Sequence, residues 1–114
     1  MNKPISIRKA QGNWTVRAGG AVLGESANAL ELCEGNYDPV IYFPRDDIAM
    51  AFLDNSDHST RCPHKGDASY FSIVTKSQTI ANAAWSYENP LKDAARIRDH
   101  IAFSKSDLVT VERV

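Results

Sequence analysis

The most informative stretch of this sequence is Thr60-Arg61-Cys62-Pro63-His64-Lys65-Gly66-Asp67-Ala68-Ser69-Tyr70-Phe71. It holds a thiol, an imidazole, an amine and a carboxylate within a few residues and then continues into apolar, aromatic sequence. Pro63 restricts φ and Gly66 permits a positive φ, so we expect a turn with a fixed backbone here. Such a turn can hold side chains in a set geometry, as a binding or catalytic site requires, but it does not define the chemistry.

Length and composition are those of one globular domain. The 114 residues suffice for one hydrophobic core, and 43% of them are hydrophobic and 24% charged. No apolar run approaches the roughly 20 residues that cross a bilayer. Residues 5–8 alternate between apolar and polar, unlike a secretory signal. We therefore expect one soluble, cytoplasmic domain spanning residues 1–114, without a membrane partner.

The charges are balanced and dispersed. The net charge is −1, from 13 basic and 14 acidic residues spread along the chain. Because binding to a phosphate backbone relies on clustered Lys and Arg, we expect no nucleic-acid partner. The two cysteines, Cys33 and Cys62, are expected to be free thiols, as is usual in the cytosol.

Residue patterning predicts mainly β structure. Apolar and polar residues alternate in the first third, with turns at 11–13 and 19–20, which is typical of an antiparallel meander. The apolar run Val40-Ile41-Tyr42-Phe43 predicts a strand buried on both faces, and Pro44 should end it. The predicted strands are 5–9, 14–18, 21–23, 29–34, 40–43, 68–75, 79–87, 101–103 and 108–111, the last two closing around a turn at 105–107.

Two short helices complete the prediction. Asp46 or Asp47 can cap a helix over residues 48–53, which contains no β-branched residue after Ile48. A polar loop at 54–59 should follow, and residues 93–100 are expected to form a short surface helix because they include few apolar positions. The predicted fold class is mainly β: a single compact domain of antiparallel strands and meanders with one or two short helices.

A metal site is the first chemical hypothesis, and the spacing argues against it. Cys33, His58, Cys62 and His64 supply the number of ligands that tetrahedral zinc needs. Only Cys62 and His64 are near neighbours, whereas structural zinc sites usually have two closely spaced ligand pairs. We therefore expect no metal site and no cofactor.

Residue order disfavours phosphate-loop and two-metal chemistry. A P-loop ends in Gly-Lys-Ser/Thr before a helix, but this chain has Lys65-Gly66-Asp67 before a predicted strand. Asp46 and Asp47 would point to opposite faces of an extended strand, and helix capping already accounts for them.

Cysteine chemistry at Cys62 stays open. His64 lies two residues on, so thiol and imidazole share a side of an extended segment, and Lys65 would lower the thiol pKa. Pro63 between them breaks that geometry, and the sequence identifies no third residue that would orient the imidazole. Cys62 is therefore either a nucleophile or a buried thiol.

Aromatic residues concentrate on the predicted strands. They are Tyr42, Phe43, Tyr70, Phe71, Trp85 and Tyr87. Most are expected in the core, because a small β domain has few other large side chains to bury. Trp85 and Tyr87 share a face of their strand, so this face could also line a pocket for a flat ligand, with Lys65 as a polar contact.

Several segments, in order along nearly the whole chain, resemble one family. They are Ala29-Leu30-Glu31-Leu32, Val40-Ile41-Tyr42-Phe43-Pro44-Arg45-Asp46-Asp47, Thr60 to Tyr70, Ala84-Trp85-Ser86-Tyr87-Glu88-Asn89-Pro90 and Ile101-Ala102-Phe103. The chain resembles the domain of unknown function family 427, whose members are small, mostly bacterial, β-rich single domains without an established activity. Where that family commonly has Cys-Pro-Tyr-Lys-Gly, this chain has His64 in the tyrosine position. The nucleotidyltransferase label sometimes given to the family lacks support here, because no Gly-Ser is followed by alternating carboxylates that could hold Mg²⁺.

Two interpretations follow, and whether the protein is an enzyme stays open, as does its oligomeric state. In the first, the domain binds or acts on a small polar or anionic ligand in an aromatic-lined pocket. The resemblance implies these candidate residues: Arg45, Asp47, Thr60, Cys62, Lys65, Gly66, Tyr70, Trp85 and Tyr87. In the second, the domain is a structural or protein-interaction module without catalytic activity, in which Cys62 is buried and Lys65 pairs with Asp46 or Asp47.

Overall fold

A computed structural model of the chain describes residues 4–114. Ten strands and three short 3₁₀ segments make up the described part. The strands are β1 (Ile5–Lys9), β2 (Trp14–Ala18), β3 (Ala21–Ser26), β4 (Leu30–Glu34), β5 (Val40–Pro44), β6 (Leu53–Cys62), β7 (Gly66–Val74), β8 (Thr79–Ser86), β9 (His100–Phe103) and β10 (Val109–Arg113). The 3₁₀ segments are η1 (Arg45–Asp47), η2 (Met50–Phe52) and η3 (Lys92–Ile97). The prediction of a mainly β fold with antiparallel pairing is confirmed.

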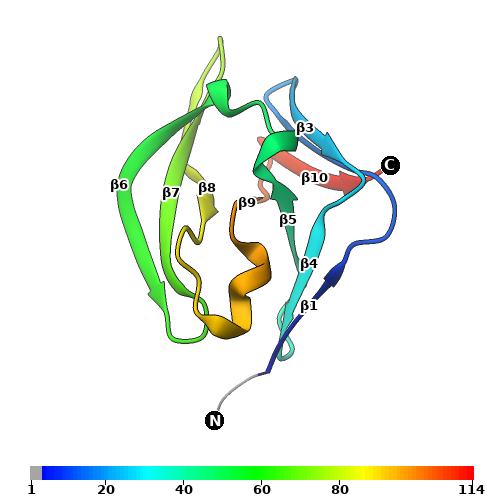
Figure 1. The fold of residues 1–114 in the computed structure, drawn as a ribbon. Helices are drawn as coiled ribbons and strands as arrows, with labels where there is room; N and C mark the ends of the chain where they lie inside the picture. Colours follow the sequence, from blue (N-terminus) through cyan, green and yellow to red (C-terminus); the bar gives the residue numbers. More distant parts are fainter. Residues whose placement is uncertain (1–3) are drawn as a thin grey trace.

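The strands form two antiparallel sheets. The seven-stranded sheet has the order β1-β4-β5-β9-β8-β7-β6, and the three-stranded sheet has the order β10-β2-β3. Figure 1 shows that the large sheet curls, so that β6, β7 and β8 face β1, β4 and β5, with the coil of η3 in the opening between them. The small sheet, with β3 and β10, lies on the side of β4 and β5.

Each face of the large sheet contributes to a core of its own. The first core lies between the two sheets; it includes Val16, Leu23, Phe43, Phe71, Ile73, Ala84, Ile101, Phe103 and Val109. The second core lies inside the curl against η3; it includes Leu30, Leu32, Tyr42, Ala68, Tyr87, Ala94, Ile97 and Ala102. Because side chains alternate along a strand, β5 sends Phe43 to the first core and Tyr42 to the second.

Several local predictions are confirmed. Tyr42 and Phe43 are 1% and 0% exposed, so β5 is buried on both faces, and it ends at Pro44. The turn after Cys62 is also defined: the amide of Lys65 donates to the Cys62 carbonyl at 3.2 Å, and Gly66 has φ +110°. A side chain at Gly66 would be strained at this φ.

The predicted meander is only partly right, because strand pairing is long-range. β2 and β3 form a hairpin, but β1 pairs with β4 rather than with β2. The predicted hairpin of the last two strands is wrong: β9 lies between β5 and β8, whereas β10 pairs with β2 in the other sheet. Local turn residues mark where a strand ends, but burial of both sheet faces selects its partner.

The predicted helices and the loop at 54–59 are also corrected. Residues 54–59 belong to the edge strand β6, whose mostly exposed polar side chains hide the strand pattern. Residues 45–52 form only the short segments η1 and η2, without a side-chain cap, and Asp47 instead accepts a hydrogen bond from Ser26 at 2.6 Å. η3 is not a surface helix throughout, since Ala94 and Ile97 are buried in the second core.

Candidate functional site

Most of the predicted site residues meet on the second-core face of the large sheet. We define the aromatic cluster as Glu34, Tyr42, Cys62, Lys65, Tyr70, Trp85 and Tyr87. Its members come from β4, β5, the end of β6, the β6–β7 turn, β7, β8 and the residue that follows β8. Strands far apart in sequence thus supply one continuous set of side chains inside the curl.

Lys65 lies between a carboxylate and an aromatic ring. Its Nζ is 3.1 Å from Oε1 of Glu34 and 5.7 Å from the centre of the Tyr87 ring. The Lys65 and Glu34 side chains are only 14% and 16% exposed. The backbone carbonyl of Lys65 also accepts a hydrogen bond from the amide of Leu91 at 2.9 Å. The expected pairing of Lys65 with Asp46 or Asp47 is therefore wrong: Glu34, which follows the inward-facing Leu32 by two residues on β4, is the partner.

Trp85 and the two inner tyrosines form the apolar side of the cluster. The indole Nε1 of Trp85 donates to the hydroxyl of Tyr42 at 3.3 Å. Burial raises the pKa of Tyr42 to about 12, although the Trp85 hydrogen bond acts in the opposite direction. Burial also raises the pKa of Tyr87. Both phenols are therefore neutral at physiological pH and serve as hydrogen-bonding or packing groups rather than as anions.

Tyr70 connects the aromatic cluster to the edge strand β6. Its hydroxyl is 3.2 Å from Oγ1 of Thr60, and its ring meets His58 edge-on with centroids 4.5 Å apart. The Tyr70 and Trp85 centroids are 6.2 Å apart. Hence His58, from the segment predicted as a loop, contacts the cluster through the ring of Tyr70.

Arg45 and Asp47 belong to the opposite face of the large sheet. Arg45 Nη2 donates to Oγ of Ser86 at 3.3 Å and to the Glu88 carboxylate at 3.1 Å, and its guanidinium lies 5.7 Å from the Phe71 ring centre. Phe71 is part of the first core, and the Ser86 side chain alternates with those of its chain neighbours, which belong to the second core. The structure therefore brings Thr60, Cys62, Lys65, Tyr70, Trp85 and Tyr87 together and places Arg45 and Asp47 apart from them.

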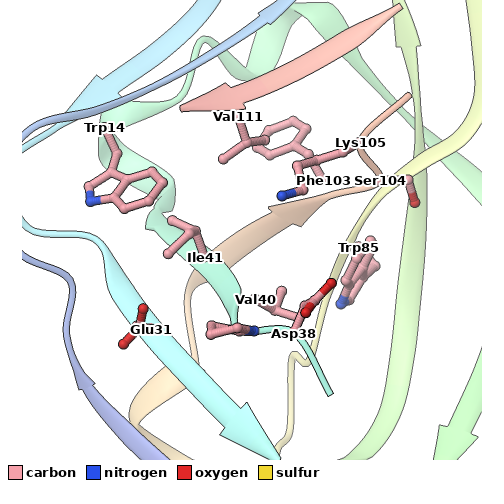
Figure 2. Close-up of a pocket in the computed structure, with 11 residues that line it drawn as sticks. Trp14, Glu31, Asp38, Val40, Ile41, Trp85, Phe103, Ser104, Lys105 and Val111 are labelled. Atoms are coloured by element: carbon pink, nitrogen blue, oxygen red, sulfur yellow. The ribbon is translucent and has the colours of Figure 1, made fainter. Parts of the chain in front are cut away.

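A pocket of about 420 Å³ opens between the two sheets, beside the first core. Its lining is Trp14, Glu31, Asp38, Pro39, Val40, Ile41, Trp85, Phe103, Ser104, Lys105 and Val111. Figure 2 shows Trp14 and Trp85 at opposite sides of this space, with Ile41, Val111 and Phe103 between them. Trp85 therefore belongs both to the aromatic cluster and to the wall of the pocket.

Charged groups of both signs stand at this pocket. Glu31 forms an ion pair with Arg8, with Nε and Oε1 2.5 Å apart. Asp38 and Lys105 come from the β4–β5 and β9–β10 loops, and within residues 4–114 neither makes a side-chain hydrogen bond or ion pair. Sequence reasoning identified only Trp85 of the lining, because no local pattern connects Trp14, Asp38 and Lys105.

Other site classes find no support in the described chain. Within residues 4–114, no group of three or more His, Cys, Asp or Glu side chains is placed to hold a metal ion. Cys33 and Cys62 are both free thiols. No helix among the described residues has the length and apolar character needed to span a membrane.

The comparison with known families agrees with the resemblance found in the sequence. The family model described as domain of unknown function DUF427 matches residues 6–114, so the chain belongs to this family. No curated protein matches the chain significantly.

Proposed function

We propose that this member of the DUF427 family is a small-molecule-binding protein whose ligand occupies the pocket between the two sheets. The observation that carries the proposal is the lining: both tryptophans of the chain, Trp14 and Trp85, border one pocket of about 420 Å³. Pockets of this size, mainly apolar and with a few polar groups, are typical of small-molecule sites.

The physical character of the pocket supports a ligand with an apolar body and a polar end. Trp14, Phe103, Ile41 and Val111 supply apolar surface, and the indole rings offer flat faces for stacking. Apolar surface in an empty pocket is exposed to water. A ligand that covers it gains roughly 25 cal/mol of binding free energy per Å² of apolar surface buried. Ligand binding would thus stabilise the contact between the two sheets.

Trp85 offers a route by which the aromatic cluster can influence the ligand. The indole of Trp85 lines the pocket, and its Nε1 donates to the hydroxyl of Tyr42 in the second core. The position of this pocket wall therefore depends on the packing of the second core. In this proposal, Thr60, Cys62, Lys65, Tyr70 and Tyr87 support the wall, and Arg45 and Asp47 hold η1 through Glu88, Ser86 and Ser26.

Ligand screening with two readouts tests the proposal. Amino acids, amines, organic acids and nucleosides are added to the full chain, and both thermal unfolding and tryptophan fluorescence are recorded. A ligand at 100 times its Kd should add about 2.7 kcal/mol to the free energy of unfolding. It must also change the fluorescence, since both tryptophans line the pocket.

A matched pair of substitutions locates the binding. Val111→Phe fills the pocket, whereas Val22→Phe adds the same volume at a residue that is 59% exposed on β3, at the other edge of the small sheet. Ligand binding should be lost in the first variant and kept in the second. Stabilisation that persists in Val111→Phe, or that leaves the fluorescence unchanged, would contradict the proposal.

A structural or interaction module without catalytic activity is the second candidate. The observation in its favour is that Lys65 and Glu34, which carry the charges of the aromatic cluster, are paired with one another and largely buried. In both cases we propose a cytoplasmic protein, because both cysteine thiols are unpaired. We also propose a partner other than nucleic acid, because the basic residues of the chain are dispersed. Absence of any ligand in the screen, combined with capture of one protein partner, would favour this candidate.

A further inference from the structure

We propose that the ligand of the inter-sheet pocket is a small zwitterion with an apolar side chain, of the kind represented by a free amino acid. This inference rests on the proposed function and specifies its ligand class. Its basis is the pairing, at one apolar pocket, of a carboxylate from one loop with an ammonium from another.

The two charges are positioned by different elements. Asp38 lies in the loop between β4 and β5, and Lys105 lies in the loop that follows β9. Figure 2 shows the Lys105 side chain beside Phe103 and the Asp38 carboxylate beside Trp85, and both residues are exposed. Neither is neutralised by another side chain within residues 4–114.

The third charge at the pocket does not compete for the ligand ammonium. Glu31 is paired with Arg8 at 2.5 Å across the β1–β4 register. The polar groups left to contact a ligand are therefore Asp38, Lys105 and the hydroxyl of Ser104. A ligand with one positive and one negative group would satisfy both unpaired charges, whereas a ligand with a single charge would leave one of them without a partner.

The apolar part of the ligand has a separate place. Trp14, Ile41 and Val111 line the side of the pocket away from Asp38 in Figure 2. A side chain extending from the charged end would lie against these residues and remove their surface from water. An α-amino acid joins both charges and an apolar group at one carbon, and it can therefore contact Asp38, Lys105 and this apolar wall together.

Three ligands of nearly equal size separate the contributions. L-Phenylalanine carries both charges, phenethylamine only the positive one, and 3-phenylpropanoate only the negative one; L-leucine tests an aliphatic side chain. Isothermal titration at pH 7 should give at least tenfold tighter binding for the better amino acid than for either single-charge analogue. A tenfold difference is about the contribution of one charge-assisted hydrogen bond.

Two charge-removing variants test the assignment of each group. Asp38→Asn should weaken phenylalanine and phenethylamine about tenfold and leave 3-phenylpropanoate unchanged. Lys105→Gln should weaken phenylalanine and 3-phenylpropanoate about tenfold and leave phenethylamine unchanged. Lys76→Gln and Asp57→Asn, at exposed positions that do not line the pocket, are the matched controls.

The outcomes distinguish this inference from the proposed function. Equal affinity for the three phenyl ligands, or amino-acid binding that both charge variants leave intact, overturns the zwitterion assignment. The same follows if neither amino acid binds while an uncharged ligand changes the tryptophan fluorescence in the native chain but not in Val111→Phe. If no compound of any charge binds, both proposals fail.

Discussion

The ion pair between Lys65 and Glu34 gives the sharpest test of how the curled sheet is held together. It connects the β6–β7 turn to β4, which lie near opposite ends of the seven-stranded order. We consider Glu34→Gln, Lys65→Met and the double substitution. Glu34→Gln leaves the Lys65 ammonium without a counter-charge, and Lys65→Met leaves the Glu34 carboxylate without one. The double substitution leaves no unpaired charge at this place.

The magnitude follows from burial. Removing one partner of a fully buried pair costs roughly 3–5 kcal/mol, because the remaining charge is desolvated and unpaired. The Lys65 and Glu34 side chains keep 14% and 16% of their exposure, so the low end of that range applies. Each single substitution should therefore lower the free energy of unfolding by about 3 kcal/mol. The double variant should lie within about 1 kcal/mol of the native protein, because apolar or neutral replacements of similar volume remove the unpaired charge.

Urea denaturation at pH 7, followed by tryptophan fluorescence, measures these differences. The exposed pair Arg61–Asp67 is the internal control, with side chains 68% and 71% exposed. Asp67→Asn should change the free energy of unfolding by no more than about 0.5 kcal/mol. The reasoning is refuted if Glu34→Gln costs no more than this control, or if the double variant loses as much as the sum of the single variants.

Two further predictions concern the cores. Because the pKa of Tyr42 is raised to about 12, its neutral form is favoured in the folded state; stability from this group is complete below about pH 10 and is lost as the pH rises toward 12. Ultraviolet titration of the phenols should show Tyr42 and Tyr87 ionising above the ordinary tyrosine pKa of about 10, and ionisation of these two phenols at that ordinary value in the folded protein would contradict their burial. At Gly24, an added Cβ would lie 2.6 Å from both the Asp47 carbonyl oxygen and Cδ1 of Ile48, so Gly24→Ala should destabilise the protein by about 1–3 kcal/mol. Calorimetry checks this against Ser59→Ala at an exposed position of the edge strand β6, which should have a much smaller effect; equal melting temperatures would show that the contact relaxes.

Strand identity was largely readable from the sequence, because alternation is a local property. The pattern around Phe71 and Ile73 places both on one face of β7, and both are in the first core. Likewise, Trp85 and Tyr87 share the second-core face. β6 was missed, since an edge strand with exposed polar side chains has no apolar face to produce the alternation.

The candidate site was predicted only in part, for the same reason of locality. Tyr70 and Trp85 face one another in the register of β7 and β8, and Cys62 and Lys65 lie in or beside the turn that leads into β7, so these four residues are close in sequence or on adjacent strands. Arg45 was grouped with them because it belongs to the segments that resemble the family. Its guanidinium, however, donates to Ser86 on the first-core face of the large sheet.

The sequence alone thus determined the β class, the two-sided burial of β5 and the fixed turn at Gly66, which depend on side-chain period and backbone freedom within a few residues. Tertiary structure decided that Lys65 pairs with Glu34 and that Trp14 faces the same pocket as Trp85. These contacts join residues separated by 31 and 71 positions, and only the pairing order of the strands determines which distant side chains meet.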